Sequence, residues 1–109
     1  AINYPGSSIE NDFRWAPMHP MVEAYKSYQQ MPYDRPTWDL TSVLYSVEGP
    51  SYFNVSPAGK INVTDQGATE FTPDAAGNRY YLTVDSIQAE NIKQHFVQLL
   101  TKQPAHFNK

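Results

Sequence analysis

Trp38 and Asp39 are the side chains whose position most favours chemistry, because they stand together at the predicted beginning of a helix. A carboxylate at a helix N-terminus lies against the positive end of the helix dipole, so Asp39 can stay ionised and point out of the fold. A second interpretation is equally open. Acidic residues commonly stabilise such a helix end without further function, and Trp38 would then belong to the core.

The rest of the sequence shows no catalytic or metal-binding motif. It contains no nucleophile elbow, phosphate-binding loop, zinc-protease helix or glycine-rich dinucleotide fingerprint. The histidines His19, His95 and His106 are far apart and lack the spacing of a metal site. His19 precedes Pro20 at a predicted helix start and has no acid beside it, so we expect a capping or packing role there.

Residues 31–45 read Met-Pro-Tyr-Asp-Arg-Pro-Thr-Trp-Asp-Leu-Thr-Ser-Val-Leu-Tyr. This stretch resembles the late helix of the inosine-uridine-preferring nucleoside hydrolase family, in the branch that has Trp-Asp at the helix entrance where other members have His-Asp-Pro. The segment from Tyr4 to Phe13, the His19-Pro20 helix and the strand that begins at Arg79 occur in that branch in the same order.

The resemblance extends over nearly the whole chain but covers only the C-terminal part of the family's domain. The family's aspartate-rich N-terminal motif, Asp-x-Asp-x-x-x-Asp-Asp, is absent from these residues. The resemblance therefore implies a parent domain of α/β type, with an open and mostly parallel sheet, of which this chain is the C-terminal portion.

The resemblance also implies cleavage of the N-glycosidic bond between ribose and a base. In the family a calcium ion, held largely by the N-terminal aspartates, positions the attacking water, and the aspartate of the late helix completes the metal shell. By motif position Asp39 is that calcium ligand. Trp38 occupies the place where a histidine can protonate the leaving base; an indole cannot do this, but it can stack on a base as a substrate-binding group.

One carboxylate cannot hold calcium, which takes about 6–8 oxygen ligands. We therefore expect the isolated chain to bind no calcium tightly and to be inactive. Its partners would be the N-terminal part of a parent protein and a nucleoside or related glycoside. Two other functions remain open: a non-catalytic α+β module that binds a partner protein through the apolar faces of residues 1–31, and a degenerate hydrolase-like domain that binds sugars without cleaving them.

The helix that presents Trp38 and Asp39 is predicted within residues 33–50, because four apolar residues recur there at i, i+3, i+4 and i+7. Pro36 suits its first turn, and Gly49 is its stop signal. The four apolar residues are Leu40, Val43, Leu44 and Val47.

We expect the whole chain, residues 1–109, to form a single α+β unit. The first segment carries large apolar side chains without a period and is predicted to be irregular and to lie across a partner surface. Short connections between the predicted strands imply antiparallel neighbours. The predicted order is an irregular segment at 1–18, two helices at 19–49, a β-meander of three or four strands at 51–84 and a last helix at 85–103.

The last helix carries the clearest capping signal in the sequence. Asp85 stands at its predicted N-cap, and Gln88 lies where a capping box requires an amide. Pro104 ends the helix, and residues 105–109 are predicted to be a frayed tail.

Composition excludes several classes of partner. The chain is 40% hydrophobic and 14% aromatic, which is typical of a packed protein. Its formal net charge is −3 with no cluster of basic residues, and no apolar run approaches the roughly 20 residues that span a bilayer, so we expect neither nucleic acid nor a membrane as partner. Without cysteine the compartment stays undecided. The resemblance also implies that this chain lacks the parallel sheet that its first two helices would cover, and their exposed apolar faces would then favour a homo-oligomer.

Overall fold

The computed structural model describes residues 2–105, which contain four α-helices and six short strands. This mixture agrees with the α+β class expected from the sequence. The helices are α1 (Gly6–Asn11), α2 (Pro20–Tyr28), α3 (Trp38–Glu48) and α4 (Ser86–Leu100), with a 3-10 helix at Gly49–Tyr52. The strands are β1 (Asn3–Tyr4), β2 (Arg35–Pro36), β3 (Asn54–Val55), β4 (Gly59–Val63), β5 (Thr69–Pro73) and β6 (Leu82–Thr83).

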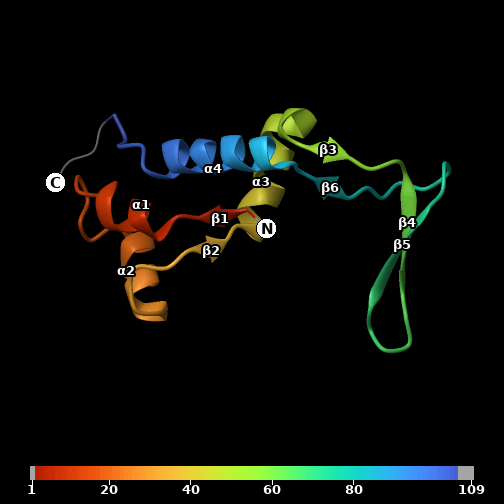
Figure 1. The fold of residues 1–109 in the computed structure, drawn as a ribbon, viewed down its shortest axis with the longest axis horizontal. Helices are drawn as coiled ribbons and strands as arrows, with labels where there is room; N and C mark the ends of the chain where they lie inside the picture. The colour runs from red at the N-terminus through yellow and green to blue at the C-terminus, as the bar shows by residue number, and fades with distance from the viewer. Residues whose placement is uncertain (1, 106–109) are drawn as a thin grey trace.

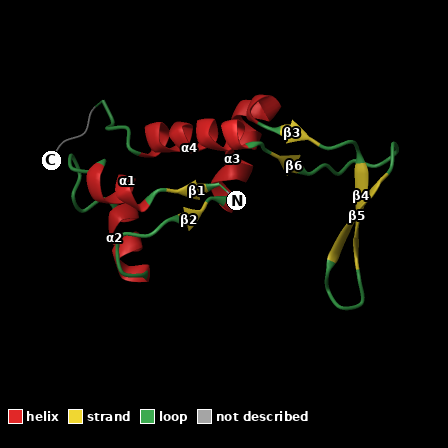
Figure 2. Ribbon diagram, in the orientation of Figure 1, coloured by secondary structure: helices red, strands yellow, loops and turns green. Residues whose placement is uncertain are grey.

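The helices gather in one body, and a long β-ribbon leaves it (Figure 1). Helix α4 runs beside β1, with α1 and α2 at one end of the body and α3 near the other. From the α3 end, β3 and β6 lead to the β4–β5 hairpin, which lies apart from all four helices (Figure 2). The principal extents of the molecule are 53 × 31 × 25 Å, so it is markedly elongated.

The N-terminal segment is not irregular throughout as predicted: it forms β1 and α1, and β1 packs against α4 of the same chain. The carboxylate of Asp34 accepts a hydrogen bond from the Gly6 N–H at the start of α1 (2.9 Å), and the Trp15 indole N–H donates to the carbonyl of Thr101 (3.1 Å). Both partners are distant in sequence. The core is Tyr4, Ile9, Phe13, Val22, Leu44, Phe53, Ile92 and Phe96.

Two predicted helix ends are confirmed by their hydrogen bonds. His19 Nδ1 accepts from the Met21 N–H (3.1 Å), so this histidine caps α2. At α4, Asp85 Oδ1 accepts from the Gln88 N–H (2.7 Å), and Gln88 Oε1 accepts from the Asp85 N–H (2.9 Å), which completes the capping box. No helix within residues 2–105 is long and apolar enough to cross a bilayer. The predicted frayed tail falls almost entirely on residues 106–109, outside those described.

Helix α3 begins later than predicted. Pro36 is not in its first turn; it lies in β2 and pairs with Asn3, and Thr37 is the N-cap. The predicted stop is confirmed, because Gly49 ends the helix with a φ of 77°, a backbone conformation that favours glycine.

The predicted meander is replaced by two nested antiparallel pairs, because β4 pairs with β5 while β3 pairs with β6. The chain turns back after β5 and crosses Gly59, whose N–H and C=O both bond to the backbone of Arg79. A Cβ on Gly59 would lie 2.2 Å from the Phe71 ring, and a Cβ on Gly77 would lie 2.1 Å from the Gly59 carbonyl oxygen. The close approach of residues 77–79 to Gly59 therefore requires residues without a side chain at both glycine positions.

Alanine substitutions on α4 test which of its faces is buried. Ile92 is fully buried and Leu99 is 52% exposed, so Ile92→Ala should cost about 3 kcal/mol and Leu99→Ala less than about 1 kcal/mol. Urea unfolding of the two variants and the wild type measures both values. Equal losses would contradict the orientation of α4.

Alkaline pH tests the burial of Tyr4. Burial raises the pKa of the Tyr4 hydroxyl; the hydrogen bond with Ser8 (2.7 Å) opposes this shift, and the charge of Asp12 adds to it. The folded chain holds the phenolic proton more tightly than the unfolded chain, so stability should be unaffected below pH 10 and should fall as pH rises beyond it. Chemical denaturation between pH 8 and 11 should show this loss, and Tyr4→Phe should make the loss shallower.

Candidate functional site

Thr37 fixes the beginning of α3 to the N-terminal segment. Its N–H donates to the Ile2 carbonyl (2.9 Å), and its hydroxyl donates to the same oxygen (2.7 Å). The neighbouring β1–β2 pairing, Asn3 with Pro36 and Tyr4 with Arg35, continues this attachment. Since Thr37 is only 4% exposed, Trp38 and Asp39 project from a firmly anchored helix end.

Asp39 is exposed and lines an open hollow of about 270 Å³, together with Tyr25, Arg35 and Thr37. Within residues 2–105 its carboxylate makes no ion pair or side-chain hydrogen bond. The Arg35 guanidinium instead stacks over the Tyr28 ring at 4.2 Å. Burial raises the pKa of Tyr25, with nearby tyrosines adding to the shift, so its hydroxyl stays protonated at neutral pH. Because neither Arg35 nor another described side chain bonds to it, the Asp39 carboxylate is available to a ligand outside this part of the chain.

Trp38 is 73% exposed, so the interpretation of this side chain as core is wrong. Trp38 lines both the Asp39 hollow and a second hollow of about 290 Å³, which is mainly apolar and is also lined by Ile2, Phe53 and Leu82. An aromatic side chain as exposed as this one can stack on a ring of a ligand.

The residues around Asp39 do not fit a calcium ion by themselves. Among residues 2–105 there is no group of three or more histidine or acidic side chains that could hold a metal. The hydroxyl of Thr37 is already donated to Ile2, and His95 Nε2 lies 2.7 Å from Glu48 and stacks on Tyr52. Asp39 can therefore supply one ligand, and the remaining oxygens must come from elsewhere.

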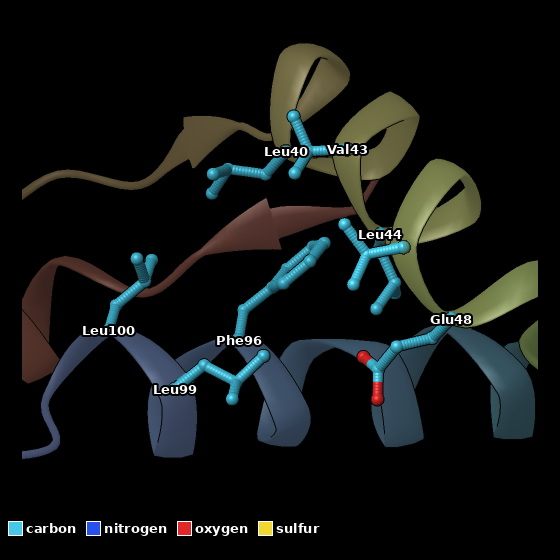
Figure 3. A pocket seen from close by; sticks show the side chains of 8 residues that line it. Leu40, Val43, Leu44, Glu48, Phe96, Leu99 and Leu100 are labelled. Carbon is cyan, nitrogen blue, oxygen red and sulfur yellow. The ribbon is translucent and has the colours of Figure 1, made fainter.

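An apolar groove between α3 and α4 is a third feature of this end of the molecule (Figure 3). It has a volume of about 180 Å³. All four residues of the predicted α3 stripe line it, but only Leu44 is buried (4% exposed), whereas Val43 and Val47 are 58% and 77% exposed. Apart from Glu48, its lining offers only apolar contact. Its lining is Leu40, Val43, Leu44, Val47, Glu48, Phe96, Leu99 and Leu100.

The sequence analysis named Trp38 and Asp39, which the structure places side by side, but it missed the residues that surround them. Thr37 was not singled out, although a threonine directly before a helix is a common N-cap. Arg35 and Tyr25 had no signal in the sequence, because they reach the hollow only after β2 and α2 are packed.

Together the fold and site define a small α+β protein with an exposed Trp-Asp pair at a helix N-terminus. Comparison with protein-family models, with curated proteins and with solved structures finds no match to this chain. The resemblance to nucleoside hydrolases therefore rests on the residues quoted above alone.

Truncation of Trp38 tests its exposure. Trp38→Ala should change the free energy of unfolding by less than about 1 kcal/mol, whereas Leu44→Ala, on the buried side of the same helix, should cost about 3 kcal/mol. Thermal or urea unfolding measures both. A large loss for Trp38→Ala would show that the indole packs in the core.

Proposed function

We propose that this chain is the C-terminal part of a nucleoside-hydrolase-like enzyme, which cleaves the N-glycosidic bond between ribose and a base. The proposal is carried by the exposed carboxylate of Asp39, which has no partner within residues 2–105 and stands beside an exposed aromatic ring. Because an acidic residue in the first turn also stabilises a helix, the support for the proposal comes from the pairing of Asp39 with the exposed Trp38 and not from the carboxylate alone.

In this proposal Asp39 contributes one carboxylate to a calcium site whose other ligands lie on an aspartate-rich N-terminal part. Calcium in such a site would orient a water and the ribose hydroxyls. The carboxylate of Asp39 stands in the first turn of α3, and the hydrogen bond from Thr37 to Ile2 fixes this end of the helix. Trp38 offers an apolar plane for the base, but it carries no proton suitable for the leaving group, so protonation of the base would depend on another residue.

The test requires a protein that contains both this chain and the aspartate-rich part. In that protein Asp39→Asn should lower nucleoside hydrolysis at least about 100-fold and weaken calcium binding in parallel. Asp65→Asn, the same change at an exposed turn, is the matched control and should leave both unchanged.

The isolated chain gives the complementary measurement. Calorimetry should detect no micromolar calcium binding, and incubation with a panel of nucleosides should release no free base. Calcium binding or turnover by these 109 residues alone would refute the assignment of the missing ligands to another part of the protein.

The alternative of a partner-binding module through residues 1–31 is less well supported. Tyr4, Ile9 and Phe13 are at most 3% exposed, because they are buried within this chain and are not free for a partner. A relative that binds sugars without cleaving them differs from the proposed enzyme in one measurement: it would retain a nucleoside at Trp38 and release no base.

A further inference from the structure

The β4–β5 hairpin, residues 59–73, has one apolar and one polar face and is here called the arm. Ile61 and Val63 point to the apolar face with Phe71, and they are 47% and 69% exposed. Tyr81 packs edge-on against Phe71, with ring centroids 4.9 Å apart, but no other layer of residues 2–105 covers this face in Figure 1. A two-stranded hairpin without such a layer is only marginally stable in water.

The edge of β4 that faces away from β5, here called the outer edge, carries main-chain N–H and C=O groups that cannot form hydrogen bonds with β5. Gly59 directs its N–H and C=O to Arg79, away from β5 (2.9 and 3.0 Å), whereas the Thr64 N–H bonds to the Ala68 carbonyl on the β5 side (2.7 Å). Because such bonds alternate along an antiparallel strand, Ile61 and Val63 also direct their N–H and C=O outward. No strand of residues 2–105 pairs with this edge beyond the single bridge at Arg79.

We propose that two copies of this chain pair through their β4 edges, antiparallel, about a two-fold axis at Asn62. In this register Ile61 lies opposite the second copy's Val63, and the two residues exchange the main-chain hydrogen bonds that each arm leaves unmade. Their side chains fall on the same face, so the two apolar faces join into one. The result is a four-stranded sheet from two hairpins, and it does not depend on the glycosidase function.

Charge complementarity favours a second copy over an unrelated strand. In the two-fold register Lys60 lies opposite the second copy's Thr64, and the second copy's Asp65 follows beside Lys60 and Arg79. A basic end therefore meets an acidic turn on each side of the axis. Asn62 meets Asn62, so no like charges stand opposite each other across the interface. Within its own chain the Lys60 ammonium lies 3.2 Å from the carboxylate of Asp74, and the Lys60 side chain is still 60% exposed, so a second copy can reach it.

Substitutions at Asn62 test the register, because this exposed residue would meet itself on the axis. Asn62→Lys and Asn62→Asp each place like charges opposite one another, so each variant should dimerise about fivefold or more weakly than the wild type. An equimolar mixture of the two variants should recover association, because lysine then faces aspartate. Sedimentation velocity across a concentration series measures all three.

Two further variants separate this interface from other surfaces. Gln98→Lys makes the same charge change on an exposed position of α4 and should leave dimerisation unchanged. Val47→Lys changes the α3–α4 groove and should also leave it unchanged. Circular dichroism checks that each variant is folded. A wild type that stays monomeric at millimolar concentration, association that responds to Val47→Lys, or variants whose mixture behaves like its components would overturn the proposal.

Discussion

The double hydrogen bond from Thr37 to the carbonyl of Ile2 holds the two halves of the helical body together. It joins Ile2 to the beginning of α3, and the β1–β2 pairing extends the contact to Tyr4, which is 1% exposed. Because Tyr4 and Ile92 are the largest fully buried side chains, this attachment also sets how β1 lies along α4. A polar contact between distant segments thus lies directly beside the most deeply buried part of the apolar core.

The same contact explains why Trp38 and Asp39 face outward. On a helix, residues three and four apart share a face, so burial of Thr37 turns Thr41 and Leu44 inward. Trp38 and Asp39 then lie on the exposed side of the first turn. The apolar period predicted Leu40, Val43, Leu44 and Val47 as one stripe. All four line the α3–α4 groove, but only Leu44 is buried, because the groove is open over Val43 and Val47.

Exposed apolar surface gathers at two places, the α3–α4 groove and the arm, and they differ in what they can specify. The groove is lined mainly by apolar side chains of two helices, whose backbone groups bond within each helix, so it accepts many partners. The arm combines an apolar face with main-chain donors and acceptors at fixed spacing, which restricts a partner to an extended strand in one register. Directional hydrogen bonds therefore make the arm the more selective surface.

The sequence by itself determined the features that depend on neighbouring residues: the α+β class, the His19 cap, the Asp85–Gln88 capping box and the stop at Gly49. Only the tertiary structure decided what depends on distant residues. The Asp34 carboxylate, which follows α2 in the sequence, accepts a hydrogen bond from the first residue of α1. The backbone bonds between Gly59 and Arg79 place the strands in nested pairs instead of a meander. Local capping has a fixed spacing along the chain, whereas contacts across tens of residues leave no periodic trace in it.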